Sequence, residues 1–410
     1  MSPAATRNGS RPLYRDPNLL IVLGVTLMAV MGVASVTPAF PRIGRAFNLS
    51  SQAVANLITV FTLPGVFLTP VLGVLADRWG RVRILFPSLI IFGLAGGACS
   101  LTRDFDLLLA LRFVQGIGAA ALSVLYITLI GDLYTGQERT TAMGYNASVL
   151  SVGTAGYPAI GGALATLGWH YPFALSVLAV PLGIAVLFTL ENPEPRQDQG
   201  LRTYLFAAWE SIRDPQAVGL FGLSLLTFLI IYGAYLTYLP FLMEEAFQSS
   251  PFVIGVTMSA MSLATAATSA LLGRLVNAWS EKTLLQVSCI FYALALLAIP
   301  RFPSVWSLWI PVILLGIAQG LSIPNLQTLM AGLAPIEHRG AFMAVNGVSL
   351  RLGQTLGPPL LGAVFGVWGV KGAFYAAAVV AAGMFLLTTV IVERREADGN
   401  GRAEVAGDLP

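Results

Sequence analysis

Two arginines lie inside long apolar segments of this sequence. Arg112 stands in the segment 107–131, and Arg351 stands well inside the segment 342–366. An arginine keeps its charge at neutral pH, and a charge at such a position normally faces a bundle interior or a cavity and has a partner. We therefore expect both arginines to contact a bound solute. The alternatives are that Arg112 reaches the membrane surface near the acids that precede its segment, and that Arg351 belongs to a buried ion pair that fixes helix packing.

Carboxylates are confined to the ends of the apolar segments. The nearest acids are Asp77, Asp132, Glu244 and Glu245. A buried acid is the group that would pair with a lipophilic cation or carry a proton through the membrane. Because the segments contain arginines and lack acids in their middle, the sequence favours neutral or anionic amphipathic ligands over cationic ones.

No residue pattern indicates catalysis. His170 and His338 lie in separate loops, and the sequence contains no metal-ligand spacing, phosphate-binding loop or nucleophile elbow. Cys99 and Cys289 each lie in an apolar segment, which favours buried hydrophobic residues over a disulfide or a metal site. The sequence therefore predicts a protein that is not an enzyme and binds no metal.

The apolar segments indicate that most of the chain lies in lipid. Hydrophobic residues make up 56% of the 410 residues and charged residues 10%, whereas a soluble domain has roughly 25% charged residues. The apolar residues form blocks of about 20, which as helices cross about 30 Å of hydrocarbon. The sequence therefore predicts an all-α membrane protein with twelve transmembrane helices. The predicted segments are 19–37, 52–75, 84–102, 107–131, 141–166, 171–190, 218–241, 252–276, 284–301, 305–332, 342–366 and 372–392.

The positions of the basic residues predict the orientation. Cytoplasmic loops carry an excess of Lys and Arg, and most of the 23 basic residues fall on one side when both termini are cytoplasmic. We expect a protein integral to the inner (cytoplasmic) cell membrane. Its predicted parts are a cytoplasmic tail (1–18), a six-helix bundle (19–190), a cytoplasmic linker with a short amphipathic helix (191–217), a second six-helix bundle (218–392) and a disordered cytoplasmic tail (393–410).

The two predicted bundles are related in sequence. At an offset of 200 residues, the stretch 139–163 matches the stretch 339–363 at eight of 25 positions. A parallel repeat of this kind is one architecture of secondary transporters, in which the solute binds near the middle of the membrane between the halves. The matching pairs are Arg139 and Arg339, Met143 and Met343, Asn146 and Asn346, Leu150 and Leu350, Gly153 and Gly353, Pro158 and Pro358, Gly162 and Gly362, and Ala163 and Ala363.

The end of the second predicted helix carries a specific motif, Gly-x-x-x-Asp-Arg-x-Gly-Arg. Its residues are Gly73, Asp77, Arg78, Gly80 and Arg81. The motif resembles the loop between helices 2 and 3 of the major facilitator superfamily. The resemblance implies a major facilitator fold in which Arg81 pairs with an acid that ends helix 4, for which Asp132 is the candidate, and Asp77 faces helix 11. This network would latch the outward-facing state. The alternative is an ordinary basic cytoplasmic loop.

The fourth predicted helix is similar to a second signature of the same superfamily. It begins with Arg112, Gln115, Gly116 and Gly118 in the spacing Arg-x-x-Gln-Gly-x-Gly. Small residues of this kind let helices approach closely in lipid.

The fifth predicted helix resembles the antiporter signature of the drug-exporting branches. Glycines recur along the stretch 144–162, although Tyr157 stands where the signature has glycine. The resemblance implies export by exchange, with Gly153, Pro158 and Gly162 taking part in gating. The alternative is a proline-kinked helix that packs through its small residues.

The resemblance also implies a central cavity lined by helices 1, 4, 7 and 10 and assisted by helices 2, 5, 8 and 11. Polar and aromatic groups around an apolar space suit a loosely specific amphiphile site. The alternative for each residue is interhelical packing or an aromatic belt at the membrane surface. The candidate substrate-binding residues are Met31, Arg112, Gln115, Tyr126, Tyr232, Tyr235, Gln319, Asn325, Arg351 and Gln354.

These features together predict a secondary active transporter that works by alternating access. The resemblance implies proton-linked efflux of small amphipathic or drug-like molecules, with the proton gradient as energy source and no cofactor. The expected partners are a small-molecule substrate and membrane lipid, without nucleic acid, and the protein is expected to be a monomer. One alternative is an uptake or exchange permease for an organic anion, and another is a non-transporting lipid scramblase or receptor on the same scaffold.

We expect Asp77→Asn to slow transport severely while leaving folding intact, because the substitution removes the charge of the latch and keeps its shape. Transport into reconstituted vesicles, compared at equal amounts of folded protein, measures this. Unchanged transport would remove the latch hypothesis.

Overall fold

The computed structural model describes residues 12–190, 214–333 and 339–391, and in this part of the chain the protein is helical without β-strands. The N-bundle contains α1 (Pro17–Ala34), α2 (Phe40–Phe47), α3 (Ser51–Trp79), α4 (Arg81–Cys99), α5 (Phe105–Leu133), α6 (Gly136–Leu167), α7 (Tyr171–Ala174) and α8 (Ala179–Thr189). The C-bundle contains α10 (Pro215–Leu229), the π-helix η4 (Ile230–Tyr238), α11 (Leu239–Phe247), α12 (Pro251–Val276), α13 (Glu281–Ala298), α14 (Val305–Leu333) and α15 (Arg339–Ile391).

The described residues include ten helical segments that are long and apolar enough to cross a membrane. α6 is not among them because glycine, serine and threonine dilute its apolar residues. α15 counts once although its 53 residues are divided by Gly369, which has a non-helical conformation with φ 67°. α6 and the division of α15 account for the difference from the twelve predicted spans, and the number twelve stays a prediction.

The internal repeat is visible in the turns that precede α3 and α12. Asn48 and Gln248, 200 residues apart, are the only non-glycine residues with positive φ in the described chain. Each ends a helix in the left-handed conformation, and two residues later Ser50 and Ser250 cap the next helix through their side chains. The two halves therefore use the same chain reversal.

Several helix boundaries differ from the sequence-based predictions. The first and seventh apolar segments continue as helix through α2 and α11, to Phe47 and Phe247, where loops were predicted. The seventh segment also passes through the π-helix η4, which periodicity alone does not reveal. The linker was predicted at 191–217 with a short amphipathic helix. Its residues 191–213 lie outside the described part of the chain, and α10 already begins at Pro215. The tails at 1–11 and 392–410 also lie outside them.

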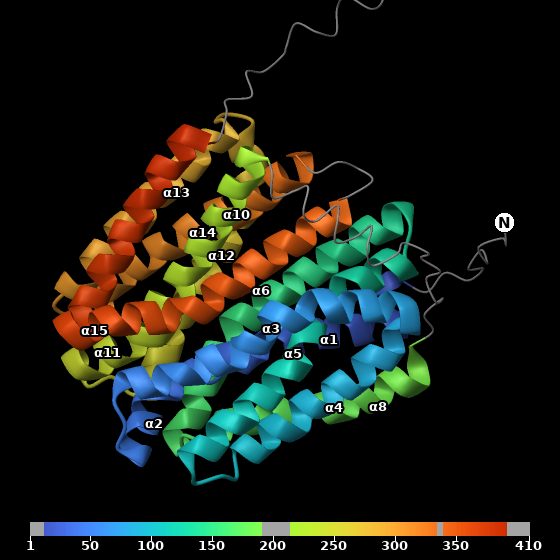
Figure 1. The fold of residues 1–410 in the computed structure, drawn as a ribbon, viewed down its shortest axis with the longest axis horizontal. Helices are drawn as coiled ribbons and strands as arrows, with labels where there is room; N and C mark the ends of the chain where they lie inside the picture. Colours follow the sequence, from blue (N-terminus) through green and yellow to red (C-terminus); the bar gives the residue numbers. More distant parts are fainter. Residues whose placement is uncertain (1–11, 191–213, 334–338, 392–410) are drawn as a thin grey trace, which may run out of the picture.

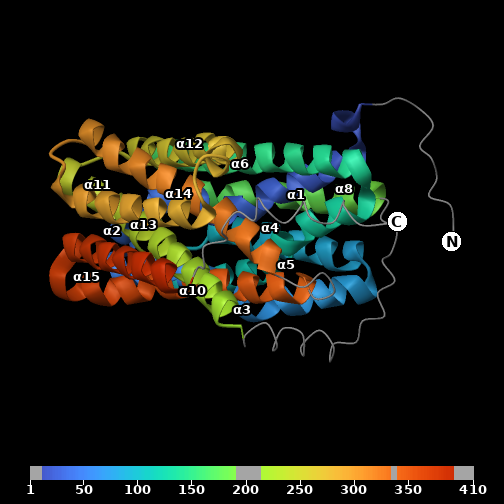
Figure 2. The ribbon, with the colours of Figure 1, turned by 90° about the horizontal axis from the view of Figure 1, so that it is seen from above.

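The two bundles meet at one end and diverge toward the other. Figure 1 shows α13 and α14 running toward the top of the view and α4 and α8 toward the right, away from the corner where α2 and α11 lie. We call that corner the closed end, and we call the opposite end, where α3 turns into α4, the open end. Figure 2 shows that α6 and α12 lie along one edge of the molecule and α3 and α15 along the other edge.

The contact between α6 and α12 near the closed end is a contact between backbones. A Cβ atom added to Gly162 of α6 would overlap the carbonyl oxygen of Pro251, and one added to Gly255 of α12 would overlap that of Pro158. By contrast, a Cβ at Gly144 of α6, near the open end, would have no heavy atom within 4 Å. Glycine is therefore required at this contact so that the two helices can touch.

Gly162→Ala should destabilise the protein by about 1–3 kcal/mol, because an added methyl group forces two backbones apart. Gly144→Ala is the matched control on the same helix, and its better helix propensity should leave stability equal or raise it by about 1 kcal/mol. Thermal unfolding of the purified protein measures both. Equal melting temperatures would contradict the packing argument.

Candidate functional site

Arg351 lies on α15 where the two bundles face each other. Its Nη1 donates a hydrogen bond of 2.9 Å to Oε1 of Gln354, one helical turn along α15. Its side chain crosses Gly65 of α3, where an added Cβ would lie 3.1 Å from Cδ of Arg351. Tyr126 of α5 and Tyr232 of η4 lie within electrostatic range of its guanidinium. These four polar side chains, Arg351, Gln354, Tyr126 and Tyr232, form what we call the Arg351 cluster.

The Arg351 cluster contains no carboxylate. Among the described side chains, the ion pairs formed by arginine involve Arg45 and Arg81. No described acid pairs with Arg351 in this conformation. Next to the cluster, the Thr355 hydroxyl donates to the Thr62 hydroxyl at 2.9 Å, which joins the two bundles. The cluster is thus a positive charge between the halves with neutral partners only.

Arg112 has a different setting, in the packed interior of the N-bundle. Arg112 is 1% exposed. Its Nη1 donates to the Gly32 carbonyl at 2.9 Å and to Gln115 Oε1 at 2.7 Å. Nε donates to the Leu57 carbonyl at 3.3 Å, and the guanidinium lies 4.1 Å from the centre of the Phe61 ring. The alternative that Arg112 reaches the membrane surface is therefore wrong. Backbone carbonyls and an aromatic ring compensate the charge where no acid is present.

Several other candidate substrate contacts are also packing residues in this conformation. Gln115 donates to the Ser176 hydroxyl at 2.8 Å, and Met31 is fully buried. Tyr235 is buried, and its hydroxyl donates to the Met258 carbonyl at 2.9 Å. In the C-bundle, Gln319 accepts a hydrogen bond from Thr265 at 3.4 Å, and Asn325 donates to the Glu281 carbonyl at 2.7 Å. The structure thus joins Tyr126, Tyr232, Arg351 and Gln354 and separates the others from them.

The gating motif forms a network at the open end. Arg81 binds Asp77 through Nη1 at 2.5 Å and Asp132 through Nε at 2.9 Å. Gly80, with φ 96°, reverses the chain between α3 and α4, and Arg78 is exposed. All three charged groups belong to the N-bundle, and no described side chain of α15 pairs with Asp77. The pairing of Arg81 with Asp132 is the one implied by the family resemblance, whereas among the described side chains Asp77 pairs with Arg81.

The helix 5 signature lies partly inside the N-bundle and partly at the contact between the bundles. Gly153 packs against Leu27 and Val30 of α1, and the backbone at Pro158 and Gly162 touches α12. A residue set that sequence reasoning missed closes the same end. Arg45 of α2 pairs with Glu244 of α11 at 2.7 Å, and the rings of Phe40 and Phe241 lie 6.3 Å apart. Opposite charges near equivalent positions of the repeat were the available signal.

Comparison with known proteins identifies the same architecture. The sequence model of the Major Facilitator Superfamily matches residues 22–246 and 237–407. The bacillibactin exporter of Bacillus subtilis (strain 168) is 24% identical over 360 residues, which cover 85% of this chain and 89% of that protein. Multidrug resistance protein 2 of the same organism is 24% identical over 353 residues, which cover 84% and 88%. An inward-facing, unoccupied structure of a bacterial homologue of the human lysosomal transporter Spinster superposes with a TM-score of 0.79 at 19% identity, covering 93% of this chain and 98% of that one.

The ion pair at the closed end should bias the opening of that end. Arg45→Glu places two negative charges together at the closed end. We expect the fraction of molecules in which this end is closed to fall on the order of two- to fivefold, because an ion pair near the surface contributes little free energy. Spin labels on the exposed positions Tyr145 of α6 and Leu271 of α12 would report a shorter open-end distance. The reversed pair, Arg45→Glu with Glu244→Arg, should restore the original distance distribution. An unchanged distribution in the single variant would contradict the role of this pair.

Proposed function

The chain belongs to the major facilitator superfamily and is a transporter, and we propose that it exports neutral or anionic amphipathic molecules in exchange for protons. The observation that carries this proposal is the charge of Arg351 between the bundles, to which the described part of the chain offers no acid. A charge held in a membrane protein without an opposite charge is costly. An anionic or strongly polar substrate group would offset that cost, whereas a cation would increase it.

Alternating access is supported by the way in which the bundles meet. They touch through backbone at the closed end, and their open ends diverge (Figure 1). The basic residues favour a cytoplasmic location for the open end and for both termini in the cell membrane. In that orientation the molecule is ready to accept a substrate from the cytoplasm. Closing the open end would bring helix 11 toward Asp77, and breaking the contact of Arg45 with Glu244 would open the other end.

Export is supported by two independent features. The relatives named above include an exporter and a multidrug resistance protein. The helix 5 signature, which is typical of exporting branches, supplies the α6 surface that packs on α12. Three carboxylates at helix ends are paired with arginines and could bind protons, namely Asp77, Asp132 and Glu244. Proton binding at such a carboxylate would break its ion pair and so couple protonation to the opening of one end.

An uptake or exchange permease for an organic anion is the second candidate. The same observation favours it, because Arg351 with its two tyrosines would hold an anion regardless of the direction of transport. The candidates differ in their response to a proton gradient.

The experiment uses everted vesicles with an imposed proton gradient and three fluorescent probes. They are anionic 1-anilinonaphthalene-8-sulfonate, neutral N-phenyl-1-naphthylamine and cationic ethidium. We expect gradient-driven accumulation of the first two. Arg351→Ala should lower transport of the anion roughly tenfold or more, because one charge-assisted hydrogen bond contributes about 1.5–3 kcal/mol, and should affect the neutral probe less.

Arg351→Lys is the matched control, since it keeps the charge and should retain part of the anion transport. Transport of the anion only against a second anion, without any effect of the proton gradient, would favour the permease. Transport of ethidium alone, or full anion transport by Arg351→Ala, would overturn the proposal.

A further inference from the structure

Gly65 of α3 lies against the end of one charged side chain. A Cβ atom added to Gly65 would lie 3.1 Å from Cδ, 3.2 Å from Nε and 3.6 Å from Cζ of Arg351. These three atoms follow one another along the side chain, so the end of the arginine runs lengthwise over the glycine. At Gly162 and Gly255 the nearest atom is instead a backbone carbonyl oxygen of the partner helix. Gly65 therefore makes room for a side chain, whereas those two glycines make room for a helix.

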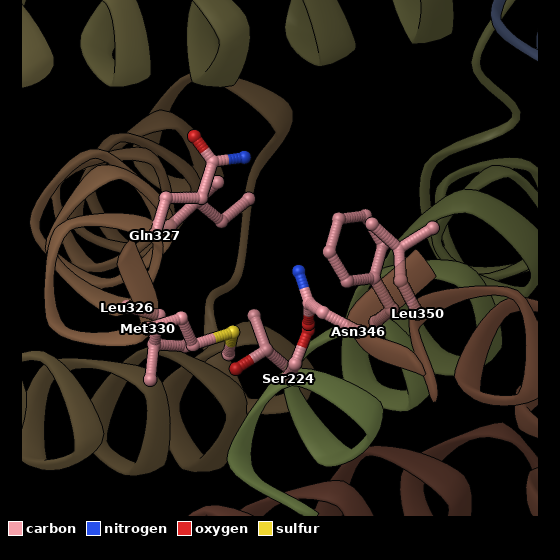
Figure 3. Close-up of a pocket in the computed structure, with 9 residues that line it drawn as sticks. Ser224, Leu326, Gln327, Met330, Asn346 and Leu350 are labelled. Carbon is pink, nitrogen blue, oxygen red and sulfur yellow. The ribbon is translucent and has the colours of Figure 1, made fainter. Parts of the chain in front are cut away.

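The rotation of α15 directs Arg351 away from its own bundle. Leu350 lines a small hollow with Ser224 of α10 and Gln327 of α14, and all three belong to the C-bundle (Figure 3). The next residue of an α-helix points about 100° further round the axis. Arg351 accordingly lies over α3 of the N-bundle. Its side chain thus crosses from one bundle to the other at Gly65.

The crossing lies where the contact between α3 and α15 ends on its open side. One turn nearer the closed end, the Thr355 hydroxyl donates to the Thr62 hydroxyl at 2.9 Å. One turn nearer the open end, a Cβ added to Gly347 of α15 would have no described heavy atom within 4 Å. Arg351 therefore stands at the boundary between the packed helices and the space between the bundles. The course of its side chain sets how far its charge extends into that space.

The internal repeat does not require a glycine at this place. Thr265 of α12 and Ser151 of α6 stand 200 residues from Gly65 and Arg351, at the equivalent point of the other edge. The hydroxyl of each donates to backbone carbonyls of its own bundle. The glycine and the arginine thus occur together on the edge where a side chain crosses between the bundles.

We propose that Gly65 is a positioning residue for Arg351 and thereby sets the preference of the protein for anionic molecules. Without a side chain at Gly65, the arginine extends over α3. Its guanidinium then lies within electrostatic range of Tyr126 of the N-bundle and of Tyr232 of the C-bundle. A methyl group at this position pushes the guanidinium aside, and the loss falls on anionic molecules more than on neutral ones. The selectivity rests on the proposed function, whereas the steric coupling of the two residues does not.

The steric coupling is tested by a double-mutant cycle on the purified full chain. Gly65→Ala should lower the melting temperature of the wild-type protein, because the new methyl group presses against Arg351. In the Arg351→Ala background the methyl group no longer meets the arginine, and alanine is the better helix former, so Gly65→Ala should leave the melting temperature equal or raise it. We expect the two effects to differ by about 2 °C or more.

The control is Gly383→Ala, on α15, where the new Cβ would have no described heavy atom within 4 Å. It should not lower the melting temperature in either background. Equal effects of Gly65→Ala in both backgrounds would overturn the proposal.

Selectivity is measured with the same variants in everted vesicles, with 1-anilinonaphthalene-8-sulfonate as the anionic probe and N-phenyl-1-naphthylamine as the neutral probe. We expect Gly65→Ala to lower the ratio of anion transport to neutral transport roughly fivefold. It should have no further effect on this ratio in the Arg351→Ala background, and Gly383→Ala should leave the ratio unchanged.

Two outcomes separate this proposal from the proposed function. A ratio that Arg351→Ala lowers and Gly65→Ala leaves unchanged would overturn the role of Gly65 and leave the proposed function standing. Full anion transport by Arg351→Ala would overturn the proposed function, and with it the effect of Gly65 on selectivity. The melting-temperature cycle would still decide the steric coupling.

Discussion

The close approach of α6 and α12 is the constraint on which the rest of the structure depends. Gly162 and Gly255 each lie against a backbone carbonyl of the partner helix, so the two bundles touch there without intervening side chains. In lipid there is little hydrophobic drive between helices, and packing this close supplies the attraction instead. Because the contact lies near one end, the helices can diverge toward the other. The open end and the exposure of the space between the bundles follow from this placement.

The two intramembrane arginines show how differently one residue type can be used. Arg112 is held by two backbone carbonyls, Gln115 and the face of Phe61, and it ties α1, α3 and α5 together. Arg351 donates one hydrogen bond within its own helix and otherwise faces two tyrosines. The first charge is compensated by the fold. The charge of Arg351 lies between the bundles, where a bound molecule can become its partner.

The repeat gives the two bundles a common frame in which their differences carry the function. The turns at Asn48 and Gln248 have the same backbone conformation. Against this frame, the ion pairs of Arg81 are not repeated among the described residues of the C-bundle, where Asn277 stands in place of Asp77. Conversely, Arg351 occupies the repeat position of Ser151. Oδ1 of Asn346 lacks the hydrogen bond that the Thr26 hydroxyl donates to Asn146. Thus the Arg81 network belongs to the N-bundle and Arg351 to the C-bundle.

The sequence by itself determined the helical membrane class, the parallel repeat, the family and the pairing candidates Arg81 and Asp132. These features depend on local hydrophobicity and on motifs a few residues long, which are read directly along the chain. Only the tertiary structure decided that Arg112 and Gln115 are packed, that Tyr235 bonds to α12, and that Arg45 meets Glu244. It also decided that η4 is a π-helix and that Oδ1 of Asn346 has no hydrogen-bond partner among the described residues. The physical reason is that burial and partnership depend on the rotation of each helix about its axis and on its neighbours in space, and spacing within one helix does not contain that information.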